Sequence, residues 1–283
     1  MRRNLLLAAA LVGAVVGLAQ LGSTGPTPVP FSGAMGHGST IVLVHGLGSG
    51  PDHWLPVARR LAQNHRVVLV ELPGHGVGAM PEPFSLETAT EALDATLRLQ
   101  SREPVVLVGH SVGGLVAVSE ALAHPERVSR LVLVETALRP QIAGHERAQM
   151  LQALATDYHG VLHSAYSSFG RDSAQGEMLY AHVAGLDSTS IARWIRLAVT
   201  ADLSNRAAAL RTPVLAVLAE RSWPRNEPWP VTGEALGLMS IPHLEPMRIS
   251  GCGHFIMLDR PEALAAAIDR FAGPLSPDLL AVR

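Results

Sequence analysis

One serine stands in a setting that favours nucleophilic chemistry. Ser111 lies in GHSVG, residues 109–113, which follows the apolar run PVVLV and opens a helical pattern. A strand that turns sharply into a helix exposes a serine hydroxyl at the edge of a sheet, and flanking glycines let the two elements approach closely. The N–H of Val112, at the helix start, then points to where an oxyanion would develop. The pattern predicts Ser111 as a nucleophile.

A general base must accept the serine proton, and His254 is the candidate. It follows the apolar run EPMRI and the turn GCG, residues 251–253, and a helix is expected to begin at Pro261. A histidine on such a loop can reach Ser111. His110 lies inside the serine motif, and we expect it to line a pocket with its side chain pointing away from the reacting atoms.

A second oxyanion donor is expected in HGLG, residues 45–48, directly after the strand pattern TIVLV. The backbone N–H of Leu47 is the candidate donor. An HG pair at the end of a strand more often shapes the loop through hydrogen bonds than supplies a base. We therefore assign a structural role to His45.

Four motifs, HGLGSGPDHW, ELPGHGVG, GHSVGG and GCGHFIMLDRPE, occur in this order between residues 40 and 272. Together they resemble the α/β-hydrolase superfamily. The resemblance implies a serine on the turn after the third strand, an oxyanion loop after the first, and a histidine on the last loop. It also implies a short version of the sheet, because residues 22–39 should leave no room for the two antiparallel strands that many members place first.

The acid of the expected triad departs from the family pattern. In many members it follows the penultimate strand in a stretch like GERD, where this chain has Ser222. Serine cannot carry the charge that stabilises an imidazolium. Glu135, at the end of the run VSRLVLV, offers a replacement, and some haloalkane dehalogenases, which this stretch resembles, keep a glutamate there. The resulting order, serine then glutamate then histidine, agrees with the chain order of the fold.

Other carboxylates compete for the role of the acid. Glu220 also ends a strand and is the alternative, whereas Glu227 and Asp202 are weaker candidates. Glu135 could instead cap the following turn or bind an arginine such as Arg139. Dehalogenase chemistry needs a carboxylate nucleophile, and position 111 is serine, so that resemblance carries over the place of the acid and not the reaction.

The elements that must position these residues alternate between short apolar runs and longer helical patterns, which favours an α/β fold with a doubly wound, mostly parallel sheet. The expected strands are 40–44, 66–71, 104–108, 129–134, 213–218 and 245–249. The expected covering helices are 52–63, 86–100, 112–123 and 261–271. The motifs thus fall at the ends of strands.

Residues 137–210 change this rhythm to helical segments without a clear strand, which predicts an inserted helical cap. The cap contains several aromatic side chains that could enclose an apolar group of a substrate or form the core of the cap itself: Tyr158, Tyr166, Phe169 and Trp194.

The N-terminus predicts export. Two arginines precede an apolar, uncharged run that ends at Leu21, so residues 1–21 are interpreted as a signal peptide or a membrane anchor. The Gly- and Pro-rich residues 22–39 are expected to form a flexible tether, followed by a catalytic domain, 40–272, and a tail, 273–283. The expected location is secreted or membrane-anchored outside the cytoplasm.

Composition and motifs exclude several classes of function. The formal charge is −2 without a basic block, so we expect no nucleic-acid partner. The chain has no metalloprotease motif, Walker loop or dinucleotide fingerprint, and we expect neither a metal nor a cofactor. The single cysteine, Cys252, is interpreted as a small buried apolar residue.

These observations predict a serine hydrolase that cleaves a small, apolar carboxylic ester through an acyl-enzyme on Ser111. The same fold and residue types also serve lactonases, amidases, carbon–carbon bond hydrolases and perhydrolases. An alternative from another class is a non-catalytic binding protein that has lost its acid, as Ser222 suggests. A carboxylate within hydrogen-bond reach of His254 Nδ1 would favour the enzyme.

Overall fold

The computed structural model describes residues 27–273. The expected signal or anchor, residues 1–21, and the expected tail, apart from Gly273, lie outside the described residues. A mixed, mostly parallel sheet forms the centre, with strand order β1-β3-β2-β4-β5-β6-β7. Its strands are β1 (Phe31–Met35), β2 (Thr40–Val44), β3 (Arg66–Val70), β4 (Val105–His110), β5 (Val128–Val134), β6 (Val214–Ala219) and β7 (Leu244–Ile249).

Continuous runs of β-branched and other apolar residues form the central strands because both faces of the sheet are covered. All residues of β4 and β6 are buried. Strands β2 to β7 run parallel to one another, with Val44 opposite Gly109 and His110 opposite Val134. Their carboxyl ends therefore lie at one edge of the sheet. The six expected strands are confirmed, with ends shifted by at most two residues.

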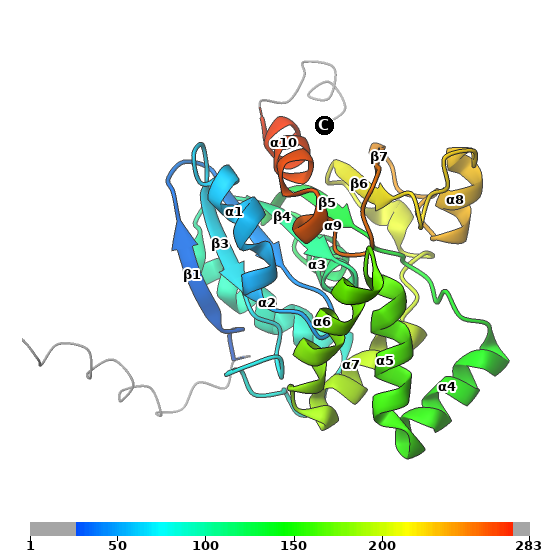
Figure 1. Ribbon diagram of the computed structural model, residues 1–283. Helices are drawn as coiled ribbons and strands as arrows, with labels where there is room; N and C mark the ends of the chain where they lie inside the picture. The colour runs from blue at the N-terminus through cyan, green and yellow to red at the C-terminus, as the bar shows by residue number, and fades with distance from the viewer. Residues whose placement is uncertain (1–26, 274–283) are drawn as a thin grey trace, which may run out of the picture.

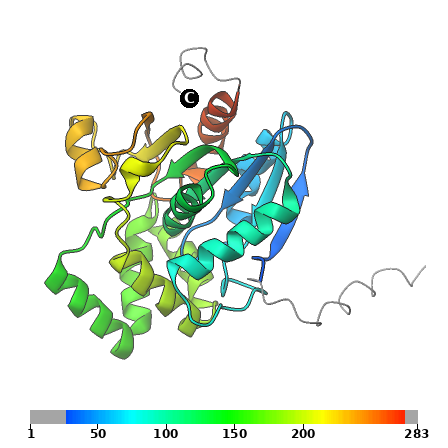
Figure 2. The ribbon, with the colours of Figure 1, turned by 180° about the vertical axis from the view of Figure 1, so that it is seen from behind.

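Helices cover the two faces of the sheet (Figures 1 and 2). One face carries the short helix η1 (Pro51–Trp54) with α1 (Leu55–Leu61), α9 (Ile256–Asp259) and α10 (Pro261–Ala272). The other carries α2 (Leu86–Gln100) and α3 (Val112–Ala123). Two further helices, η2 (Ala207–Ala209) and α8 (Trp229–Ala235), flank β6, and neither was expected from the sequence pattern.

The segment between β5 and β6 forms the expected helical insertion. It contains α4 (Gly144–Thr156), α5 (Tyr158–Phe169), α6 (Ser173–Ala184) and α7 (Ser188–Thr200). An aspartate caps three of these helices by accepting a hydrogen bond from a backbone N–H in the first turn: Asp157 from Gly160, Asp172 from Gln175 and Asp187 from Ser190. Such caps satisfy donors that have no partner inside the helix. The aspartates before α5, α6 and α7 thus define where these three helices begin.

The expectation of a flexible tether over residues 22–39 is wrong for its second half. Residues 31–35 form β1, the edge strand of the sheet, which pairs antiparallel with β3, and Pro30 accepts a hydrogen bond from Glu71 N–H. Gly36 and Gly38 adopt positive φ and turn the chain into β2. The sequence pattern did not predict this strand because its glycines and prolines are typical of a loop. The strand forms because its backbone groups pair with those that β3 would otherwise leave unpaired. The sheet thus has one antiparallel strand of the kind that the short version was expected to lack.

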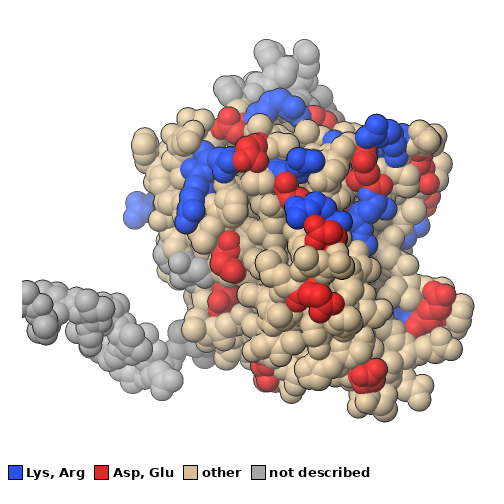
Figure 3. Space-filling model, viewed as in Figure 1, with Lys and Arg blue, Asp and Glu red and all other residues tan. Residues whose placement is uncertain are grey.

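Charged side chains are unevenly distributed on the face shown in Figure 3. Basic and acidic residues mix over its upper part, and the lower part, which the cap helices form, is mostly uncharged with separate acidic residues. Over residues 27–273 no helix combines the length and the hydropathy needed to cross a bilayer.

Candidate active site

Ser111 occupies a sharp turn between β4 and α3. Its φ of 51° and ψ of −121° are unusual for a residue other than glycine. Ser111 N–H donates to the Val134 carbonyl at 2.9 Å, which holds the turn against β5. Gly113 allows the helix to begin at once, because a side chain there would collide with the carbonyl of His45. Backbone strain of this kind is found where a side chain must be presented at a functional site.

Glu135 and His254 contact each other directly. The distance from His254 Nδ1 to Glu135 Oε2 is 3.0 Å, and the two side chains are 13% and 0% exposed. Glu135 also accepts hydrogen bonds from Ala219 N–H at 2.7 Å and from the Ser222 hydroxyl at 2.8 Å. Its φ of 50° places it, like Ser111, in the left-handed region. A buried carboxylate surrounded by donors suits the orientation of an imidazole.

Ser222, which stands where many family members have the acid, is thus a partner of the carboxylate. Its hydroxyl reaches Glu135 from the segment after β6, while Glu135 reaches the same place from the end of β5. The sequence pattern did not predict this contact, although a serine at the usual acid position was a signal. The carboxylate that follows β5 is therefore held by hydrogen-bond donors at the end of the neighbouring strand β6.

The loop after β2 lies beside the serine. A Cβ placed on Gly46 would be 3.1 Å from Ser111 Cβ, so the residues around Leu47 are close to the strand–helix turn. His45 Nδ1–H donates to the Gly46 carbonyl at 2.8 Å, and its Nε2 accepts from Leu72 N–H at 2.9 Å. Both ring nitrogens of His45 are occupied, which agrees with the expected structural role.

Several buried histidines surround the site in the neutral form. Burial lowers the pKa of His45 and of His110 well below the usual value, and it lowers the pKa of His75 to about 4. His110 Nε2 lies 3.0 Å from the His254 carbonyl, and the two rings are 4.7 Å apart. Because a carbonyl accepts only, His110 donates this bond through Nε2–H and thereby holds the backbone of the histidine loop.

The competing carboxylates have other partners. Glu220 accepts hydrogen bonds from Ser250 at 2.7 Å and from Arg225 at 2.9 Å and 2.7 Å. Their side chains lower the pKa of Glu220. The other two candidates accept bonds from hydroxyls close in sequence: Glu227 from Thr232 and Asp202 from Ser204. Arg139 pairs with Glu234 instead of Glu135. Among these carboxylates, Glu135 is the one within hydrogen-bond distance of His254.

The aromatic residues expected at a pocket divide into two groups. Phe169 stacks on the His254 imidazole, with ring centroids 4.6 Å apart, and the Tyr166 hydroxyl donates to the Leu47 carbonyl at 2.7 Å. Trp194 is fully buried and donates through Nε1–H to the Pro73 carbonyl. Tyr158 lies beside His159 and lines a hollow of the cap that contains none of the triad residues. Phe169 and Tyr166 thus contact the site, and the other two contact other parts of the cap and core.

Among residues 27–273, two groups of side chains have donor atoms close enough to hold a metal ion. One is Asp52, His53 and His182, between η1 and α6, and the other is Asp94, Glu120 and His124, between α2 and α3. In each group the donor atoms lie within 4.8 Å of one another. Neither group contains Ser111, Glu135 or His254.

One hollow of the surface lies away from the serine. Its volume is about 550 Å³, and it lies between the start of α2 and the end of α7, lined by residues such as Phe84, Arg193 and Leu203. None of Ser111, Glu135 and His254 lines it. The hollow and the triad are therefore separate features of the molecule.

The chain is similar to several known esterases. Curated relatives include the pimeloyl-(acyl-carrier protein) methyl ester esterase of Xanthomonas campestris pv. campestris, 29% identical over 85% of this chain and 98% of the relative. The enzyme of the same name from Pseudoalteromonas atlantica is 32% identical over 51% of this chain, and the match spans 58% of that relative. A thermophilic esterase from Thermogutta terrifontis has the same fold, with a TM-score of 0.72, 21% identity, and coverage of 86% of this chain and 92% of that one.

A solved structure of an N-acyl homoserine lactone degrading enzyme also shares the fold, with a TM-score of 0.74, 21% identity, and coverage of 86% and 96% of the two chains. The model of the "Alpha/beta hydrolase family" matches residues 41–267, from the start of β2 to the middle of α10. This range includes every residue of the site described above. The chain therefore belongs to the alpha/beta hydrolase family.

Proposed function

We propose that this protein is a serine hydrolase that cleaves a carboxylic ester through an acyl-enzyme on Ser111. The observation that carries the proposal is the 3.0 Å contact between Glu135 Oε2 and His254 Nδ1, at the sheet edge where Ser111 occupies a strained turn. A binding protein that had lost its acid would leave His254 without a carboxylate. The contact therefore favours an enzyme over that alternative.

The reaction begins with proton transfer from the serine. His254 Nδ1–H donates to Glu135, so Nε2 carries the free lone pair and accepts the proton of the Ser111 hydroxyl as the oxygen attacks the ester carbonyl. Glu135 stays ionised and stabilises the imidazolium that forms. The backbone N–H groups of Leu47 and Val112 donate to the oxyanion of the tetrahedral intermediate.

Collapse of the intermediate releases the alcohol, which takes its proton from His254 Nε2–H. His254 then removes a proton from water, and the resulting attack on the acyl-enzyme frees the carboxylic acid and restores Ser111. Every step needs only side chains and backbone groups of this chain together with water.

Two observations support an uncharged ester of a small alcohol as the substrate class. The relatives from Xanthomonas campestris and Pseudoalteromonas atlantica are methyl ester esterases by name. The face of the cap seen in Figure 3 is mostly uncharged, and the Phe169 ring covers His254. A small leaving alcohol needs little room beside the imidazole, and an apolar acyl group can lie against aromatic side chains.

The test combines a covalent probe with a substrate series. We expect a fluorophosphonate probe to add to Ser111, as mass spectrometry of the digested protein would show, and the protein to hydrolyse methyl and p-nitrophenyl esters of short and medium acyl chains. Ser111→Ala is the matched control and should abolish both labelling and turnover. A folded wild-type protein that neither reacts with the probe nor cleaves any ester would refute the proposal.

A further inference from the structure

Two loops carry the chemistry proposed above, and both contact the same part of the cap. We call residues 45–48, after β2, the oxyanion loop, and residues 251–255, after β7, the histidine loop. The cap corner is the end of α5 with the turn into α6, residues 166–171. Figure 1 shows α5 and α6 beside the loops that follow the strands.

The oxyanion loop is held on both sides of one peptide group, the one that joins Leu47 to Gly48. Its carbonyl oxygen accepts a hydrogen bond from the Tyr166 hydroxyl at 2.7 Å, and its N–H donates to His75 Nε2 at 3.0 Å. Gly48 has a φ of 58°, and a side chain there would collide with Tyr166 and Val183. Fixing this peptide plane restricts the direction of the neighbouring Leu47 N–H, the proposed oxyanion donor.

Both partners of this peptide group are suited to the task. Tyr166 is 1% exposed, and burial raises the pKa of its hydroxyl, which keeps it a donor. Burial lowers the pKa of His75 to about 4, so its Nε2 accepts at neutral pH. The Pro73 carbonyl, 3.3 Å from His75 Nδ1, fixes the tautomer. A buried hydrogen bond with satisfied partners is costly to break.

The histidine loop is held by the next residues of the cap corner. His254 N–H donates to the Phe169 carbonyl at 2.9 Å, and the Phe169 ring stacks on the imidazole. Gly253 lies so close to the cap corner that a Cβ there would be 2.7 Å from the backbone nitrogen of Arg171. Backbone and ring of one cap residue therefore set the position of the proposed base.

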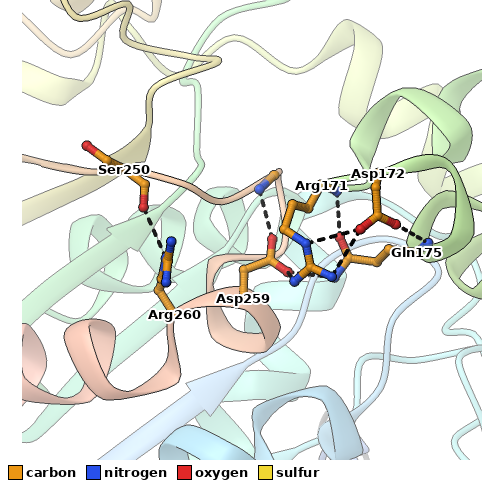
Figure 4. Close-up of polar contacts among 7 residues, drawn as sticks. Arg171, Asp172, Gln175, Ser250, Asp259 and Arg260 are labelled. Carbon is orange, nitrogen blue, oxygen red and sulfur yellow. Dashed lines mark hydrogen bonds and ion pairs between the residues drawn. The ribbon is translucent and has the colours of Figure 1, made fainter.

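A buried aspartate completes this attachment (Figure 4). The Asp259 side chain is 0% exposed and accepts hydrogen bonds from Gly253 N–H at 2.8 Å, from Arg171 at 3.0 Å and from Gln175 at 2.6 Å. Arg171 also pairs with Asp172, the residue that caps α6. One carboxylate thus joins the histidine loop to the start of α6.

We infer that the cap corner is a positioning element that sets the oxyanion loop and the histidine loop relative to Ser111. The cap then does more than cover a substrate, because α5 contributes Tyr166 to one loop and Phe169 to the other. Small displacements of reacting groups slow catalysis strongly, so loss of these contacts should lower the rate of the chemical step more than substrate binding. The inference rests on the proposed function.

Tyr166→Phe removes one hydroxyl and keeps the ring. We expect kcat for a p-nitrophenyl ester to fall about tenfold, because one buried hydrogen bond to the oxyanion loop is lost, while KM changes by less than about twofold. The rate constant for fluorophosphonate labelling of Ser111 should fall by the same factor. A side chain with a purely structural role would lower the melting temperature and leave the kinetics of the folded protein unchanged.

The second arm tests the histidine loop. Arg171→Met should reduce kcat and the labelling rate about threefold to tenfold, since Asp259 loses its charged partner, and Arg171→Lys should restore most of the rate. Glu177→Gln is the matched control, because it breaks an exposed pair between His163 of α5 and Glu177 of α6. This control should keep the wild-type kinetics.

The outcomes separate the inference from the proposed function. Failure of wild-type Ser111 to react with the probe would contradict the function. Wild-type labelling together with unchanged rates in both Tyr166→Phe and Arg171→Met would overturn the positioning role. If Tyr166→Phe does not fold, Arg171→Met decides alone, because that side chain is half-exposed and its replacement is tolerated more easily.

Discussion

Glu135 and Glu120 are two buried glutamates of this protein that differ in their hydrogen-bond partners. Glu135 is 6% exposed as a whole residue, although its side chain is fully buried, and it has three hydrogen-bond partners, one of them His254. Glu120 is 0% exposed, and neither of its carboxyl oxygens has a partner among the described residues. Desolvation, together with the charge of Asp94, raises the pKa of Glu120 to about 8. Burial and a nearby negative charge together therefore raise the pKa of a carboxyl group that lacks hydrogen-bond donors.

The positions of the two glutamates explain why one has hydrogen-bond donors and the other has none. The end of β5 places Glu135 where Ala219 N–H and the Ser222 hydroxyl point at it, whereas Glu120 lies within α3, where the helix uses its own backbone donors. Strand ends leave backbone groups free, and helix interiors do not. Functional carboxylates are accordingly expected at strand ends in this fold.

The largest expected effect is on turnover. Glu135→Gln removes the charge that stabilises the imidazolium and should reduce kcat by about 10⁴-fold, the loss seen when a triad acid becomes an amide. Steady-state hydrolysis of a p-nitrophenyl ester measures it. Glu120→Gln is the matched control, buried but remote from His254, and should keep kcat. Equal losses of kcat in the two variants would contradict the assignment of Glu135 as the acid of the triad.

A second effect concerns the dependence of stability on pH. The folded protein keeps a proton on Glu120 up to about pH 8, whereas the unfolded chain releases it near its ordinary value, so the stability of the wild type falls as the pH rises through this range. The loss at neutral pH is roughly 3 kcal/mol. Glu120→Gln should abolish this slope in urea unfolding measured from about pH 5 to pH 8. A slope equal to that of the wild type would show that Glu120 is ionised in the folded state.

A smaller effect is expected for the hydroxyl that supports the acid. Ser222→Ala leaves Glu135 with two partners instead of three and should lower kcat about threefold to tenfold, the effect of one typical hydrogen bond of about 1 kcal/mol. KM should stay the same. Ser222→Thr keeps a hydroxyl and serves as the control. An unchanged kcat in Ser222→Ala would show that Ala219 N–H and His254 suffice.

The smallest effect is expected at the alternative acid. Glu220→Gln should leave kcat within about twofold of the wild type, because Glu220 is bound to Ser250 and Arg225 and not to His254. The same ester assay measures it beside Glu135→Gln. A severe loss for Glu220→Gln with a mild loss for Glu135→Gln would reverse the assignment of the acid.

Local sequence patterns predicted most of the fold. The apolar runs located six of the seven strands, and the helical patterns located the covering helices and the cap. The edge strand β1 was missed because its residues, FSGAM between glycines and prolines, have no strand pattern of their own. That strand exists because β3 offers it unpaired backbone groups, which no short window of sequence reveals.

The same division holds for the site. The sequence by itself determined the turn at Ser111 and the loops that carry Leu47 and His254, because glycines and strand ends act over a few residues. Tertiary structure decided which carboxylate meets His254 and that Tyr166 reaches the Leu47 carbonyl, since each pair lies 119 residues apart. Such contacts depend on how the sheet and cap pack, and only the packed chain fixes the distances on which hydrogen bonds depend.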